Sequence, residues 1–166
     1  KKHAAESQII AKDVLKRLKF DNDTLNKVTR LVCYHDYRMP AAAKNVRRAM
    51  NQIGEDIFPY YMEVRRADVL AQSMYRRDEK IKNLDEIEAL YREIIKEKQC
   101  VTLKGLAVSG KDLIALGMKP GKEIGACLNQ LLERVIEEPQ WNEKEKLLEL
   151  VSAVNAEADH DRKSIE

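Results

Sequence analysis

The segment from residue 113 to 125, LIALGMKPGKEIG, places two lysines among glycines at the spacing of a tight helical hairpin. Gly117 lies where a helix C-cap needs a positive φ, and Pro120 is placed to open a second helix. The first N–H groups of that helix have no intrahelical partner. Beside Lys119 and Lys122 they would attract a phosphate. We interpret the hairpin as a clamp for a nucleic-acid backbone. The alternative is an ordinary helical hairpin that ends at a glycine.

Other basic residues are candidates for phosphate contacts. Guanidinium groups match phosphate oxygens, and tyrosine rings stack on exposed bases. The further candidates are Gly121 in the turn, Lys111 at the start of the preceding helix, and the arginine pairs Arg47, Arg48, Arg65 and Arg66. The tyrosines near these arginines in sequence are Tyr34, Tyr37, Tyr60, Tyr61 and Tyr75. The alternative is that the arginines form salt bridges, for example to Asp68, and that Tyr60 and Tyr61 pack in the core.

Three residues on separate expected helices invite a metal site: His3, His35 and Asp68. Imidazole and carboxylate ligands on neighbouring helices of a bundle can share a divalent ion whose bound water attacks a phosphoester. The dipeptide His35-Asp36 strengthens this interpretation. Against it, consecutive helical residues point about 100° apart. A lone histidine on an apolar stripe is more often a core residue.

Catalytic motifs are not visible in the chain. It contains neither a GxxxxGK[ST] phosphate loop nor a GxSxG nucleophile turn, and no strand-borne carboxylate pair of the kind that holds two metals for nucleotidyl transfer. We therefore assign no catalytic residue.

Composition favours an all-α fold. Of 166 residues, 44% are hydrophobic, 35% charged and only 5% aromatic, and Gly and Pro are few. No apolar run approaches the roughly 20 residues of a membrane span, and the first residues lack the apolar stretch of a signal peptide. We expect a cytoplasmic protein. The chain begins at Lys1, already close to an amphipathic pattern, so we expect a fragment of a longer protein.

Cysteine usage and charge distribution add weaker constraints. Cys33, Cys100 and Cys127 are odd in number and far apart, which indicates reduced thiols rather than a disulfide framework or a metal knuckle. Residues 1–83 contain 18 Lys and Arg against 11 Asp and Glu, whereas residues 84–166 contain 12 against 17. The basic half suits phosphate binding, although a solvated helix surface gives similar counts.

Hydrophobic periodicity and breakers predict five helices in the first part of the chain and three in the second. The expected ranges are 4–18, 24–35, 42–53, 57–76, a helix that starts at 83 or 85 and ends at 98, 111–116, 122–138 and 142–156. The segment CVTLKGLAVSG at 100–110 loses the helical period and is the best candidate for a linker or lobe boundary. We expect a multi-helix body at 1–99, followed by a smaller helical tail at 100–166 that contains the glycine-turn hairpin.

Four segments occur in an order that is similar to a known family: KRLKFDNDTLNKVTRLVCYHDYRM, NVRRAMNQIGEDIF, EVRRADVLAQS and LAVSGKDLIALGMKPGKEIGACLNQLLERVIEEP. Together they closely resemble the C-terminal portion of bacterial tRNA nucleotidyltransferases, the CCA-adding and poly(A) polymerase family, in the type with an HD-like helical region. The resemblance covers nearly the whole chain. It implies a body and tail that bind tRNA along its acceptor and T arms.

In that family an N-terminal head carries the chemistry, so this chain alone is expected to be inactive. Mg and CTP or ATP would be cofactors of that absent head. The resemblance also implies that His3, His35 and Asp68 match three of six HD-type metal ligands, and that Asp36 is not one of them. The other three would lie upstream, so divalent metal would bind poorly.

Two other classes of function remain open at this stage. One is a fragment of an HD-type metal-dependent phosphohydrolase. The other is a helical interaction or dimerisation module, with a seam formed by Leu147, Leu148, Leu150, Val151 and Val154. The sequence does not distinguish CCA addition from partial CCA or poly(A) addition, and it leaves the oligomeric state open.

Overall fold

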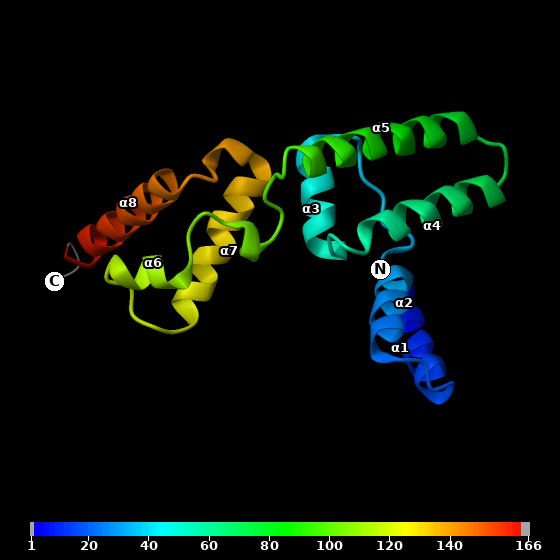
Figure 1. Cartoon of the computed structure of the whole chain (residues 1–166), viewed down its shortest axis with the longest axis horizontal. Coiled ribbons are helices and arrows are strands. Elements are labelled where there is room, and N and C mark those ends of the chain that lie inside the picture. Colours follow the sequence, from blue (N-terminus) through cyan, green and yellow to red (C-terminus); the bar gives the residue numbers. More distant parts are fainter. Residues whose placement is uncertain (1, 164–166) are drawn as a thin grey trace. The chain divides into compact units, whose positions relative to one another are not determined.

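The structure, a computed structural model, describes the backbone of residues 2–163 and the side chains of residues 4–153. Within this range all regular elements are helices, namely eight α-helices and two short 3-10 helices (Figure 1). The all-α prediction is confirmed. The chain divides into two compact units, Lys1–Glu97 and Lys98–Glu166.

The first unit contains α1 Lys2–Arg17, α2 Asn22–Tyr34, α3 Ala43–Ile53, α4 Phe58–Ala71 and α5 Arg77–Lys96. α1 packs along α2, α2 contacts α3 and α4, and α3 and α4 both pack against α5. The fully buried side chains at these contacts include Met50, Phe58 and Ile87. This packing holds α4 and α5 next to each other.

Local chemistry accounts for several helix ends. The Asp21 carboxylate accepts a hydrogen bond from the Thr24 amide at 2.9 Å and caps α2. α3 ends at Gly54, whose φ of 109° suits a glycine. Pro59 lies in the first turn of α4, where its missing N–H costs no hydrogen bond.

The boundary between α4 and α5 was predicted wrongly. The sequence placed the end of α4 at Arg76 and the start of α5 at Asn83 or Asp85, but α4 ends at Ala71 and α5 begins at Arg77. The Arg77 guanidinium donates hydrogen bonds to the carbonyls of Leu70 and Gln72, which have lost their helical partners. Arg76 adopts a φ of 52°, and acidic residues fill the first turn of α5, where the helix dipole favours them.

The apolar stripe of the first helix is not buried within the described structure. Ile9, Ile10 and Leu18 have exposed fractions of 62%, 64% and 60%. Periodicity correctly predicted the helix. It did not predict whether the stripe would be covered.

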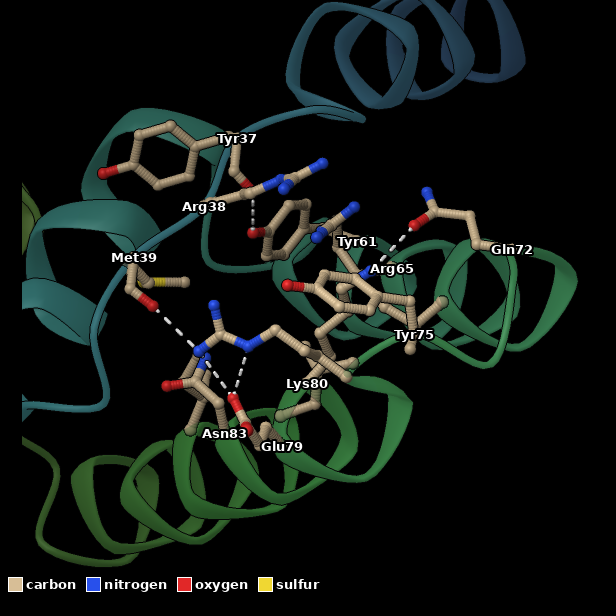
Figure 2. Close-up of a pocket in the computed structure, with 14 residues that line it drawn as sticks. Tyr37, Arg38, Met39, Tyr61, Arg65, Gln72, Tyr75, Glu79, Lys80 and Asn83 are labelled. Atoms are coloured by element: carbon tan, nitrogen blue, oxygen red, sulfur yellow. Dashed lines mark hydrogen bonds and ion pairs between the residues drawn. The ribbon is translucent and has the colours of Figure 1, made fainter.

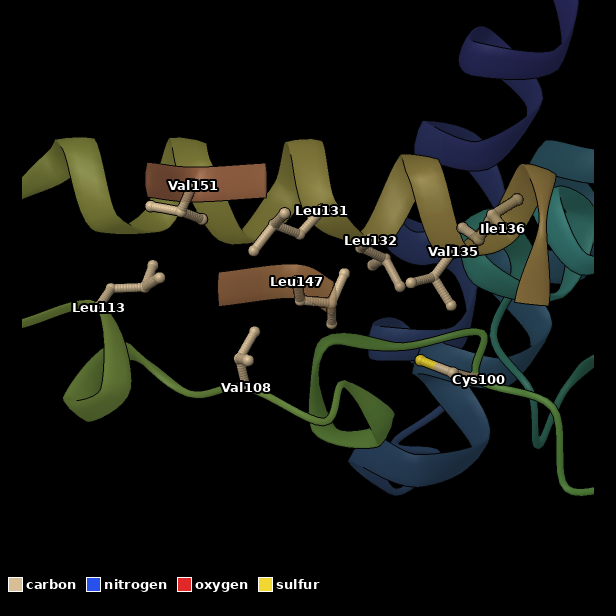
Figure 3. Close-up of a cluster of buried hydrophobic side chains, with 9 residues drawn as sticks. All are labelled: Cys100, Val108, Leu113, Leu131, Leu132, Val135, Ile136, Leu147 and Val151. Carbon is tan, nitrogen blue, oxygen red and sulfur yellow. The ribbon is translucent and has the colours of Figure 1, made fainter. Parts of the chain in front are cut away.

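The second unit contains a 3-10 turn η1 at Leu103–Gly105, α6 Gly110–Ala115, α7 Lys122–Glu137, a 3-10 turn η2 at Pro139–Trp141, and α8 Lys144–Lys163. Its core is formed by the loop before α6 and by α6, α7 and α8, as Figure 3 shows for Cys100, Val108, Leu113, Leu131, Leu132, Val135, Ile136, Leu147 and Val151. α7 packs against α6, η1 and η2, and α6 contacts α8.

The irregular segment before α6 belongs to this core. Cys100 and Val108 are buried in its cluster, whereas Leu103, Lys104 and Gly105 between them are exposed. The Asn142 side chain donates to the Gly105 carbonyl at 2.9 Å and accepts from the Ala107 amide at 2.8 Å. These bonds satisfy backbone groups that have no helical partner. None of the described helices combines the length and apolar composition that crossing a bilayer requires.

Candidate nucleic-acid interface

The hairpin between α6 and α7 has a fixed geometry at its first turn. Gly117 has a φ of 93°, as predicted for a helix C-cap. The Met118 amide donates to the Leu113 carbonyl at 3.1 Å, and the Gly117 amide donates to the Ile114 carbonyl at 2.9 Å. This pair of bonds is the Schellman motif. Met118 also packs against the core that contains Leu113, which ties the turn to the folded unit.

The start of α6 is held by a capping box. The Asp112 carboxylate accepts from the Ser109 amide at 2.8 Å and from its hydroxyl at 2.6 Å. The Lys144 ammonium, at the start of α8, forms an ion pair with Asp112. The Lys144 contact, followed by the Ser109 hydrogen bonds, holds the pKa of Asp112 well below its usual range. Lys111 therefore projects from a short helix that is anchored at both ends.

The start of α7 is open toward solvent. Its N-cap residue, Gly121, has no side chain to bond the first amides of the helix. A Cβ added at Gly121 or Gly125 would meet no atom within 4 Å, so another molecule can approach this backbone closely. Glu123 lies in the same first turn and competes for the positive end of the helix dipole.

The hairpin lysines are exposed, as a phosphate clamp requires. Lys111, Lys119 and Lys122 all project into solvent. Among the residues that the structure describes, none of their ammonium groups has a hydrogen bond or an ion pair. The structure therefore places all four predicted hairpin contacts, the three lysines and Gly121, on one α6–α7 unit with no internal partner for the charges.

The predicted arginine contacts are arranged differently. Arg65 is buried and donates to the Asp68 carboxylate at 2.9 Å, which is one of the salt bridges considered from the sequence. Arg66 pairs with two acidic residues of α5, Asp85 at 2.7 Å and Glu88 at 3.0 Å. These partners already use the guanidinium groups that the sequence assigned to phosphate.

The other arginine pair, Arg47 and Arg48, lies on α3 in the first unit. Arg47 is buried and Arg48 is half-buried, and both have interactions within the structure. All four arginines therefore differ from the hairpin lysines, whose charges have no partner in the described part of the chain.

The two metal candidates whose side chains the structure describes, His35 and Asp68, each contact other groups of the chain. The side chain of His3 lies outside the described residues. The His35 Nδ1 atom is 2.7 Å from the Val32 carbonyl, and Arg65 lies between the His35 carbonyl and the Asp68 carboxylate. A guanidinium at that carboxylate repels a second cation. Among the described residues no group of three or more His, Cys, Asp and Glu is placed to hold a metal ion.

A cavity in the first unit was not found from the sequence. It has a volume of about 480 Å³ and is lined by residues of α4, α5, the connection between them and the segment after α2 (Figure 2). Its lining includes Arg38, Arg76 and Lys80, which the sequence analysis did not single out. The chain contains three Tyr-Arg dipeptides, and those at 37–38 and 75–76 line the cavity whereas the one at 91–92 does not, so the dipeptide by itself does not predict the cavity.

Residues 4–151 match the model of the family described as tRNA nucleotidyltransferase domain 2. A CCA-adding enzyme of Lacticaseibacillus paracasei is 40% identical over 52 residues, which is 31% of this chain and 13% of that enzyme. The chain thus matches only a small part of the relative's length. No solved structure matches the chain.

Proposed function

Because this chain belongs to the tRNA nucleotidyltransferase domain 2 family, we propose that it is the tRNA-binding body and tail of an enzyme that adds CCA to tRNA 3′ ends. Nucleotidyl transfer, with Mg and CTP or ATP, would be carried out by residues outside these 166. The chain would bind the acceptor and T arms. These arms present a regular double-helical backbone, which proteins recognise through its phosphates and shape.

The observation that carries this proposal is the α6–α7 hairpin. Three exposed lysines without partners in the described structure surround a helix start that has no side-chain cap. Backbone amides, the helix dipole and ammonium groups attract a phosphate together. The turn at Gly117 and the core contact of Met118 fix the backbone of the hairpin before RNA arrives, so binding would need to order only the lysine side chains.

The test is tRNA binding by the variant Lys119→Glu/Lys122→Glu at several salt concentrations. Log affinity falls with log salt, and each lost phosphate contact makes this slope shallower by about 0.9. The double variant should therefore bind more weakly, with a slope shallower by about 2. Two comparators, a tRNA without its terminal CCA and a single-stranded RNA of equal length, separate shape recognition from general charge.

Lys82→Glu/Lys96→Glu is the matched control, because it makes the same charge change at two exposed lysines of α5. This control variant should retain most of the salt dependence of tRNA binding. Both variants are first checked for native helicity by circular dichroism. A folded hairpin variant with unchanged affinity and unchanged slope would remove the hairpin from this proposal.

The alternative functions have weaker support. The dimerisation seam would need Leu147 and Val151 at the surface, but both are buried in the core of their own unit. Leu148 and Leu150 pack partly against the same core, and the side chain of Val154 lies outside the described residues. The phosphohydrolase alternative would need a metal site, and Arg65 occupies the Asp68 carboxylate that such a site would use.

A further inference from the structure

The cavity between α4 and α5 combines positive charge with aromatic rings in one concave site. Four cationic side chains line it, Arg38, Arg65, Arg76 and Lys80, against one carboxylate, that of Glu79. A concave surface lined by one sign of charge concentrates the field and favours counter-ions. Its volume of about 480 Å³ falls in the range of about 300–1,000 Å³ that is usual for small-molecule pockets.

Two of the four cations keep charge available for a ligand. Arg38 is exposed and has no hydrogen bond or ion pair within the described part of the chain. The Lys80 ammonium donates to the neutral Gln72 side chain at 3.2 Å, so its position is set without its charge being neutralised. The Gln72 amide in turn donates to Asp68 at 2.9 Å, which links Lys80 to the buried Arg65 ion pair.

The other two cations already have acidic partners. Arg76 pairs with Glu79 at the start of α5, and Arg65 pairs with Asp68. They contribute to the positive field of the cavity, but their closest contacts are carboxylates. Arg38 and Lys80 are therefore the groups best placed to bind an added anion.

The aromatic side of the cavity contains one fixed tyrosine and one exposed tyrosine. Tyr61 is buried and donates its hydroxyl proton to the Tyr37 carbonyl at 2.7 Å. Burial raises its pKa to about 12, so it stays a neutral donor at neutral pH. Tyr75 has an exposed fraction of 74% and yet lines the same cavity. Figure 2 shows its side chain extending across the cavity between Tyr61 and Lys80.

An exposed tyrosine next to unneutralised cations is a suitable platform for a base. Aromatic rings stack on nucleobases at about 1–3 kcal/mol per base, whatever the base. Arginine and lysine bind the attached phosphate. Acidic peptides would use the cations but would not use the flat exposed ring, and an apolar ligand would leave the charges unpaired.

We propose that this cavity binds one 5′-phosphorylated nucleoside, with its base stacked on Tyr75 and its phosphate at Arg38 and Lys80. The nucleotide can come from two sources, a free mononucleotide or an unpaired residue of an RNA strand. The site rests on the proposed tRNA-binding function and would add a second group of RNA contacts, made by residues other than those of the hairpin. Binding of a mononucleotide does not depend on the hairpin lysines.

The test measures binding to the full 166-residue chain by isothermal titration calorimetry at low salt. The probes are CMP, AMP, cytidine, inorganic phosphate and a 5′-phosphorylated single-stranded trinucleotide. Tyr75→Ala and Arg38→Ala should each weaken binding of CMP, AMP or the trinucleotide about tenfold. Tyr75→Trp should retain binding, because stacking needs only an aromatic face.

Two control variants act outside the cavity. Tyr60→Ala removes a half-exposed tyrosine of α4, and Arg92→Ala removes an exposed arginine of α5. Neither residue lines the cavity, and neither variant should change nucleotide affinity. Lys119→Glu/Lys122→Glu should also leave it unchanged. This last arm separates the failure of the cavity proposal from the failure of the hairpin proposal.

Binding of CMP and AMP, each stronger than cytidine or phosphate, supports the site with a free nucleotide as ligand. Binding of the trinucleotide alone, with the same loss in Tyr75→Ala and Arg38→Ala, supports it with an RNA strand as the source. The proposal is overturned if neither the mononucleotides nor the trinucleotide bind at millimolar concentration, or if phosphate alone binds as well as CMP. It is also overturned if a folded Tyr75→Ala variant binds these nucleotides with unchanged affinity.

Discussion

Replacing Gly117 or Gly125 by alanine adds one methyl group to open space, but the two changes should alter the free energy of unfolding in opposite directions. A Cβ at either position would meet no atom within 4 Å, so no steric clash contributes. Gly117 has a φ of 93°, in a region where a residue with a Cβ costs about 1–2 kcal/mol. Gly125 lies inside α7, where alanine is favoured over glycine by about 0.5–1 kcal/mol.

Trp141 provides the assay, because it is the single tryptophan of the chain and lies in the second unit. Its ring contacts the Arg134 guanidinium, 4.7 Å from the ring centroid, so its emission reports on the packing of this unit. The second unit, Lys98–Glu166, has the size of a small domain, and in such a domain 1 kcal/mol shifts the Tm by about 4–8 °C. Gly117→Ala should therefore lower the Tm by roughly 4 °C or more, and Gly125→Ala should raise it by about 2–8 °C.

The sign of each shift is the decisive result. If Gly117→Ala left the Tm unchanged, the left-handed turn would not exist in solution, and the geometry of the hairpin clamp would be lost with it. If Gly125→Ala lowered the Tm, α7 would not begin at Lys122. The double variant provides a check, since the two sites share no contact and their effects should nearly add.

Two further predictions concern the same unit. Leu147→Ala empties a fully buried position and should lower the free energy of unfolding in urea by about 2–5 kcal/mol, whereas a loss below about 1 kcal/mol would place Leu147 outside the core. The pKa of Asp112 is depressed in the folded state. Its carboxylate therefore stabilises the fold above pH 3.8, the pKa in the unfolded chain, and this stabilisation is lost as the pH falls from there toward the folded-state pKa. Asp112→Asn should therefore be less stable than the parent at pH 7, and this difference should shrink as the pH drops through 4 toward 2; a difference that stayed constant over this range would contradict the Lys144 and Ser109 contacts.

Some features depended on short-range chemistry, and these were predictable. Asp21 caps α2 and Gly117 ends α6, because each acts on backbone groups within a few residues of itself. Helical periodicity identified the elements of both units for the same reason. Four sequence segments, in their order along the chain, resembled a family of tRNA nucleotidyltransferases, and residues 4–151 match a family model of that description. The family assignment was therefore also accessible from the sequence.

Other features depended on side-chain contacts that periodicity does not reveal. Arg77 donates to the carbonyls of Leu70 and Gln72, seven and five residues earlier, at the point where α4 ends. Arg66 finds Asp85 and Glu88 on another helix, so its charge is used internally. Whether an arginine is available to a phosphate is set by such pairings, and sequence position does not reveal them.

The sequence by itself determined the helical class, the glycine turn and the lysines that flank it, because these follow from backbone sterics and local hydrogen bonding. Only the tertiary structure decided which charges are neutralised. It pairs Arg65 and Arg66 with carboxylates, and it leaves Lys119 and Lys122 without a partner among the described residues. It also brings Arg38 and Tyr75 to one cavity across nearly forty residues of chain. The physical reason is that ion pairing and concavity depend on distances between helices, and packing of the core sets those distances.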